Sequence, residues 1–163
     1  MTKGTVLDVV GTLSRLGLAA VWLVSGGLKV ADPNQTFIAV QAYDVLPGGV
    51  VSVVAAAMPF LELALGLLLL VGLGTRLTAV LSGLVLLAFI AAVAQSWARG
   101  LSIDCGCFGG GGPVAQGDTR YPEEIARDIG FLALAVWLMV RPRTRFSLDG
   151  RLAGRVEEPV RTS

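Results

Sequence analysis

The stretch Leu77–Ala98, LTAVLSGLVLLAFIAAVAQSWA, runs for 22 residues without a charged side chain. A helix needs about 20 largely apolar residues to cross the hydrocarbon core of a bilayer, so this stretch predicts a membrane-spanning helix. Its apolar residues are continuous, and the alternation of apolar and polar residues that is typical of a strand is missing. The stretch therefore favours an all-α membrane protein.

Three further segments of 17 to 22 residues have a similar composition, with one to three charged residues each. Together with 77–98 they predict an integral membrane four-helix bundle with spans at about residues 9–30, 50–71 and 124–140. The composition agrees, because 54% of the residues are hydrophobic and 15% are charged, whereas soluble domains average about 45–50% and about 25%. A cleaved signal peptide is disfavoured, since Arg15 interrupts the first apolar run. The basic residues form no stripe with interleaved aromatic residues, so no nucleic acid is expected as a partner.

The basic residues also predict the orientation of the spans. Lys3 precedes the first span, Arg76 is the only charged residue between the second and third, and six arginines follow the fourth. Short segments rich in Lys and Arg stay in the cytoplasm. We therefore expect a multi-pass protein of the cytoplasmic (plasma) membrane with both termini in the cytoplasm. The net-negative connections 31–49 and 99–124 are predicted to lie outside.

The same features predict the domain organisation. Residues 1–141 are expected to form one four-span membrane domain, and residues 142–163 an arginine-rich cytoplasmic tail that contacts anionic membrane lipid. In the first outer connection, Phe37–Tyr43 predicts a short amphipathic helix at the interface, ended by Pro47. An ordinary loop with one helical turn is the alternative at this position.

Several charges fall inside the predicted spans, where an ionisable residue usually faces a partner or a cavity. At about 1.5 Å per residue, Arg15 and Glu62 lie roughly 22 and 18 Å from the outer ends of their spans, which predicts that they pair. Lys29 and Asp128, next to Arg127, lie near the outer ends of the first and fourth spans and predict a second contact. These charges either fix the helix register or line a cavity for a quinone-like ligand or a proton route.

Cys105 and Cys107 are the only cysteines, and the chain has no histidine. They precede four consecutive glycines in the connection predicted to face the oxidising side, where disulfides form and persist. A disulfide across one residue is strained, and strained, exposed disulfides exchange readily with other thiols. Asp104 would raise the thiol pKa unless an arginine offsets it, or would help to move protons. A static loop staple is the alternative; no metal site is expected, because zinc needs four ligands.

These residues resemble the methylamine-utilisation MauE family, which belongs with the wider DoxX-like membrane proteins. The resemblance covers roughly residues 10–140, and Cys105-Gly-Cys-Phe-Gly109 with Arg127-Asp128 downstream is its most specific part. It also rests on Arg15, Ser25-Gly-Gly-Leu-Lys29, Tyr43, Leu46-Pro47 and Pro59-Phe-Leu-Glu62. The resemblance implies a membrane protein of thiol–disulfide metabolism that acts with a thioredoxin-like partner. Through the DoxX-like relatives, the resemblance also implies a link to membrane oxidoreductase complexes and, in some cases, quinone as an electron acceptor.

The hypothesis from the sequence is a thiol–disulfide relay, which would make the chain a component of a thiol–disulfide oxidoreductase. Cys105 and Cys107 would exchange electrons with an extracytoplasmic thioredoxin-like or substrate protein, and Asp104, Lys29, Arg127, Asp128, Arg15 and Glu62 would support them. The sequence assigns no cofactor with certainty, and quinone is the candidate acceptor. The alternative is a non-catalytic structural or assembly subunit of a larger membrane complex.

Overall fold

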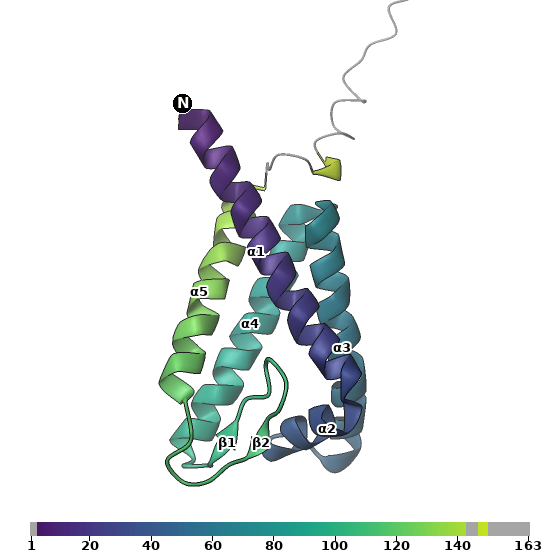
Figure 1. Ribbon diagram of the computed structural model, residues 1–163, viewed down its shortest axis with the longest axis vertical. Coiled ribbons are helices and arrows are strands. Elements are labelled where there is room, and N and C mark those ends of the chain that lie inside the picture. The colour runs from purple at the N-terminus through teal and green to yellow at the C-terminus, as the bar shows by residue number, and fades with distance from the viewer. Residues whose placement is uncertain (1–2, 143–146, 150–163) are drawn as a thin grey trace, which may run out of the picture.

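The computed structural model of the chain describes residues 3–142 and 147–149. Figure 1 shows long helices that run side by side, with a short helix and a small two-stranded sheet gathered at one end. The elements in chain order are α1 (Lys3–Ala31), α2 (Pro33–Ala42), α3 (Gly48–Val71), α4 (Thr75–Ala98), β1 (Ile103–Asp104), β2 (Gly112–Pro113) and α5 (Tyr121–Val140). The predicted all-α architecture is confirmed, apart from this minimal sheet. Most of the predicted tail, residues 143–146 and 150–163, lies outside the described residues.

Three of the helices, α1, α3 and α4, are long and apolar enough to cross a membrane. The fourth long helix, α5, runs beside α4 and packs along it. Its first two turns carry Glu123, Glu124, Arg127 and Asp128, and an uninterrupted apolar stretch begins only after them. A fourth membrane span at α5 therefore stays a prediction.

Apolar side chains both fill the interior of the helices and cover their outer surface. The central core holds Leu18, Trp22, Leu65, Leu86 and Leu138, all nearly inaccessible. Trp22 satisfies its indole N–H by donating to Ser82 Oγ at 3.0 Å. Many other large apolar side chains point outward, among them Leu13, Val53, Phe60, Leu77 and Leu84. An outward apolar surface of this extent suits a lipid environment.

Helices α1 and α3 are antiparallel and touch at small residues, but the C-terminal end of α1 and the N-terminal end of α3 lie at different levels. A Cβ atom at Gly26 would lie 2.9 Å from the Pro59 carbonyl oxygen and 3.1 Å from Glu62 Cβ. Gly26 belongs to the last turns of α1, whereas Glu62 lies near the middle of α3. The first turns of α3 therefore extend past the end of α1 and pack against α2 instead (Figure 1).

The short helix predicted between the first two spans is present as α2, but it begins earlier than expected and ends at Ala42. Pro47 does not end this helix and instead precedes α3 as its N-cap residue. Asp32 caps α2 by accepting a hydrogen bond from the Gln35 backbone N–H at 3.0 Å, and Pro33 follows in the first turn. This Asp–Pro order is a strong start signal for a helix. The side of α2 that is buried consists of the small residues Thr36 and Ala39, so close approach rather than a wide apolar stripe docks it.

Candidate functional site

The two cysteines lie in a loop that turns back toward the helices. The loop joins β1 to β2, and in Figure 1 it rises from the small sheet alongside α4. Gly106 and Gly111 have positive φ angles of 67° and 97°, and a Cβ on either would lie 2.8 Å from Ala39 Cβ. Glycine is needed there both for the backbone angle and for the close contact with α2.

This packing buries both thiols, which the sequence did not lead us to expect. A glycine-rich connection is typical of a mobile, exposed loop, yet Cys105 and Cys107 are only 9% and 8% exposed. Hydrogen bonds fix the loop backbone at several points. Tyr43 Oη donates to the Cys105 carbonyl at 3.1 Å, and Gln35 Nε2 donates to the Gly111 carbonyl. Burial raises the pKa of Tyr43, so its hydroxyl keeps the proton that it donates.

The two thiols are free, and their environments are unequal. Cys105 Sγ accepts hydrogen bonds from the Cys107 backbone N–H at 3.2 Å and from Arg127 Nη2 at 3.7 Å. A hydrogen bond from the Cys107 thiol lowers the pKa of Cys105 below its ordinary value, against the effect of burial, and Arg127 adds to the lowering. The same bond and burial raise the pKa of Cys107 well above its ordinary value. A single thiolate is therefore favoured at Cys105.

Arg127 is positioned by two neighbours besides the sulfur. Its Nε donates to Asp128 Oδ1 at 3.1 Å, and its guanidinium carbon lies 4.9 Å from the centre of the Phe108 ring. The structure thus brings Arg127 and Asp128 together with the cysteines, although they come from α5. Asp104 is exposed and accepts from the Gly106 backbone N–H at 2.8 Å, which shapes the turn between the two thiols.

A buried polar network connects the other side of the loop to α1 and α3. Lys29 Nζ lies 2.5 Å from Glu62 Oε1 and 2.9 Å from Ser25 Oγ. Ser25 Oγ in turn lies 2.6 Å from the Cys107 carbonyl oxygen and 2.9 Å from Glu62 Oε2. Ser25 is therefore the link between this ion pair and the cysteine loop.

Both predicted ion pairs were wrong. Lys29 pairs with Glu62 rather than with Asp128, because the offset of α3 brings the middle of that helix to the C-terminal end of α1. The predicted partner of Glu62, Arg15, lies far from the cysteine loop along α1, toward the N-terminal end of that helix. There its Nη1 donates to the carbonyls of Leu69 and Leu70 at 2.8 and 3.0 Å, in the last turn of α3. Arg15 therefore does not belong to the cysteine site.

Three residues that hold this site together, Ser25, Tyr121 and Glu124, were not among the site residues predicted from the sequence. Ser25 is one turn before Lys29 on the same face of α1, and that spacing was the available signal. Tyr121 Oη donates to the Leu101 carbonyl at 2.6 Å and accepts from Ile103 N–H at 3.2 Å, which anchors β1. Glu124 Oε1 accepts from Cys105 N–H at 3.5 Å. For Tyr121 and Glu124 no local sequence pattern pointed to these contacts.

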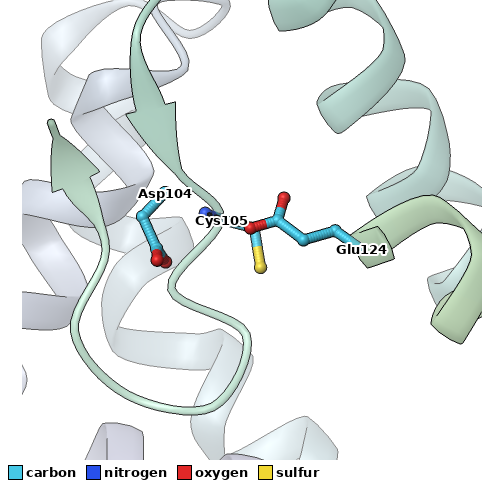
Figure 2. A group of neighbouring side chains, drawn as sticks. All are labelled: Asp104, Cys105 and Glu124. Carbon is cyan, nitrogen blue, oxygen red and sulfur yellow. Dashed lines mark hydrogen bonds between the residues drawn. The ribbon is translucent and has the colours of Figure 1, made fainter. Parts of the chain in front are cut away.

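One group of side chains offers atoms that could bind a metal ion, but the group is incomplete. Figure 2 shows Asp104 and Glu124 approaching Cys105 from opposite sides, with one ligand atom of each within 4.8 Å of the others. Zinc in proteins usually takes four ligands, and the described residues supply three. The guanidinium of Arg127 also lies against Cys105 Sγ, where its charge disfavours a cation. We therefore assign no metal to this group.

A cavity of about 110 Å³ opens beside the thiols. Its walls are mostly apolar and come from α2, α3 and α4, through residues such as Val40, Met58 and Phe89. Cys105, Cys107 and Lys29 form its polar side. The two sulfur atoms therefore border a mostly apolar cavity and are not directly exposed to water.

Comparison with known proteins agrees with the features described above. No curated protein and no solved structure matches the chain. The sequence model of one family, described as methylamine utilisation protein MauE, matches residues 7–141, which take in nearly all of α1 and every later element through α5. With three apolar helices of membrane-spanning length and this match over most of its residues, the chain is a multi-pass membrane protein that belongs to the MauE family.

Proposed function

We propose that the chain is a thiol–disulfide redox component of the cytoplasmic membrane. Cys105 and Cys107 relay electrons to or from an extracytoplasmic thioredoxin-like or substrate protein. The proposal rests on the hydrogen-bond donors around one sulfur atom. Cys105 Sγ accepts hydrogen bonds from N–H groups of both Cys107 and Arg127. The thiolate is the nucleophile in thiol–disulfide exchange. Cys105 is therefore the attacking residue.

The proposed exchange has two steps. The Cys105 thiolate attacks a disulfide of the partner, so that a mixed disulfide forms and one partner sulfur leaves as a thiolate. Cys107 then attacks Cys105 Sγ, which forms the Cys105–Cys107 disulfide and releases the second partner thiolate. Two electrons pass to the partner, and the two protons lost by the cysteines are available to its thiolates. The reverse sequence oxidises a partner dithiol.

The proposed topology places this chemistry outside the cytoplasm. Residues 1–141 form a four-span domain, with α5 as the fourth span, and residues 142–163 are a cytoplasmic tail. The distribution of arginine supports this orientation, since the segments that follow α3 and α5 are basic and the cysteine connection is net negative. An oxidising exterior would keep the pair available as a disulfide.

Quinone is the candidate acceptor that would reset the pair. The apolar cavity beside the thiols, with Lys29 as a donor, has a lining that suits such a ring. Its volume of about 110 Å³ is below the roughly 150 Å³ of a cavity that admits benzene. The cavity would have to widen, so we assign quinone no step. Extraction of quinone from the purified protein would support its role.

The burial of both thiols favours one alternative, a structural or assembly subunit of a larger membrane complex. A buried pair in a loop fixed by Ser25, Tyr43 and Gln35 would also serve as a rigid element. This alternative predicts stable co-purification with the complex and tolerance of the double substitution Cys105→Ser and Cys107→Ser.

Trapping of the mixed disulfide tests the relay. In Cys107→Ser, the attack by Cys105 cannot be resolved, so a disulfide-linked partner should accumulate and be identifiable by mass. Cys105→Ser is the matched control and should trap far less, because it lacks the favoured thiolate. If both single variants and the double variant oxidise or reduce the partner at the wild-type rate, the relay proposal fails.

A further inference from the structure

Asp128 is a buried carboxylate that is only half satisfied. It lies in α5 and is 3% exposed. Its Oδ1 accepts from Arg127 Nε, but within residues 3–142 and 147–149 no hydrogen bond reaches its Oδ2. An unpaired buried oxygen costs free energy, so such an atom calls for an explanation by water, an ion or a chemical role.

The small cavity beside Asp128 points to that explanation. The cavity measures about 10 Å³, and Asp128, Cys107 and Ser25 contribute to its wall. That volume is close to the space that one water molecule requires. Its other walls are apolar, including Trp22, Phe108 and Phe131. A single water in this cavity would have polar partners only toward Asp128, Cys107 and Ser25.

We propose that Asp128, through one water molecule in this cavity, accepts the proton of the Cys107 thiol and returns it. This inference rests on the relay proposed above and adds the proton route. When Cys107 attacks Cys105 Sγ, its S–H bond breaks and the proton passes through the water to Asp128 Oδ2. In the reverse direction Cys107 leaves Cys105 as a thiolate, and Asp128 returns the proton to it.

Cys107 needs a nearby proton acceptor more than Cys105 does. Cys105 has the Arg127 guanidinium and a backbone N–H at its sulfur, whereas Cys107 lies deeper and donates its proton to Cys105. A buried thiol that must ionise during a reaction gains from a positioned base, which typically contributes about 10²–10⁴-fold in rate.

Two other ionisable groups near Cys107 are already engaged. Glu62 uses both carboxylate oxygens on Lys29 and Ser25, and Lys29 is held between these two residues. The charged and titratable groups that face Asp128 and Cys107 are Arg127 on α5, Lys29 on α1, Tyr43 after α2 and Cys105 in the loop, with Glu124 one turn away on α5. Glu124 Oε2 also accepts no hydrogen bond within the described residues, but Glu124 contacts the Cys105 N–H, whereas Asp128 lines the cavity that Cys107 shares.

The test uses an aromatic disulfide reagent whose released thiolate absorbs visible light. The reduced protein contains only two cysteines, so the first release reports labelling of Cys105, and the second reports the attack of Cys107 on the label at Cys105. In Asp128→Asn the amide oxygen still accepts from Arg127, but the group cannot take the proton. We expect the second release to slow on the order of 100-fold at pH 7. It should then rise with pH, whereas the wild type reaches its plateau at lower pH.

The controls separate this inference from the relay itself. Asp118→Asn, an exposed aspartate of the same connection, should keep the wild-type pH profile. If Asp128→Asn has the wild-type profile, the proton route is wrong while the relay stands. If the wild type shows no second release, the pair does not close and the relay itself fails. Should Asp128→Asn not fold, Asp128→Glu must keep the plateau, and its loss would overturn the inference.

Discussion

At the residue scale, the two thiols are distinguished by what reaches each sulfur. A glycine separates them in sequence, yet Cys105 has a cationic neighbour from α5 and Cys107 has a carboxylate that shares its cavity. Two cysteines only one residue apart in the sequence thus have different surroundings in the structure. In the proposed relay, Cys105 attacks the partner and Cys107 resolves the mixed disulfide.

Substitution of Arg127 tests this difference. Arg127→Gln removes the charge beside Cys105 Sγ and raises the pKa of that thiol, so less thiolate is present at neutral pH. We expect alkylation of Cys105 by iodoacetamide at pH 7 to slow several-fold, with its rate recovering as the pH rises. Site-resolved peptide mass spectrometry measures both cysteines at once. In the wild type, Cys105 should react about tenfold faster than Cys107.

Arg120→Gln is the matched control for that experiment. Arg120 is exposed and precedes α5 without a side-chain cap contact. Its loss should leave both alkylation rates near those of the wild type. An equal slowing in Arg120→Gln and Arg127→Gln, or faster alkylation of Cys107 than of Cys105 in the wild type, would contradict the assignment of the thiolate to Cys105.

At the element scale, the position of α1 along the axis of α3 decides which charged side chains form ion pairs. The contact at Gly26 brings Ser25 and Lys29 opposite Glu62, and this network then holds the Cys107 carbonyl. A buried ion pair usually adds little net stability, since desolvation offsets the attraction. Here the ion pair fixes the register of α1 against α3, and the same residues also hold the cysteine loop.

A methyl group at Gly26 should disturb that register. Gly26→Ala places a Cβ 2.9 Å from the Pro59 carbonyl oxygen and from Leu63 Cγ, and a backbone atom of a helix cannot move aside cheaply. We expect a loss of about 1–3 kcal/mol in the free energy of unfolding, measured by denaturant titration in detergent micelles. Gly27→Ala is the control, as nothing lies within 4 Å of its added Cβ. Equal stability of the two variants would rule out the close contact.

The sequence carried enough information for the helices but not for their relative levels. Continuous apolar runs predicted α1, α3, α4 and α5 because length and composition are local properties. The pairing of Arg15 with Glu62 failed because it assumed that the outer ends of two helices are level, whereas α2 fills the space beside the start of α3. The burial of the cysteine loop could not be predicted from the sequence either. Four consecutive glycines are compatible both with a flexible connection and with the tight packing on Ala39.

At the scale of the whole molecule, polar groups are concentrated at the two ends of an otherwise apolar body. One end holds the thiols, Arg127, Asp128 and the Lys29–Glu62 pair. At the other end Asp149 accepts from the backbone N–H groups of Gly74 and Thr75 at 2.8 and 2.9 Å, which caps α4. These hydrogen bonds lower the pKa of Asp149, so the cap persists at neutral pH. The segment after α5 thus returns to the connection between α3 and α4, which agrees with a common side for both.

That common side gives the final prediction, which concerns the membrane topology. Alkaline phosphatase matures only outside the cytoplasm, where its disulfides can form. Fused after Gly117, in the cysteine connection, it should be active, and fused after Arg141, beyond α5, it should be inactive. Fusions after Asp44 and after Gly74 are the matched outer and inner controls. If α5 crosses the membrane, activity must differ between Gly117 and Arg141; equal activity at these two sites would leave three spans and put the C-terminus on the same side as the thiols.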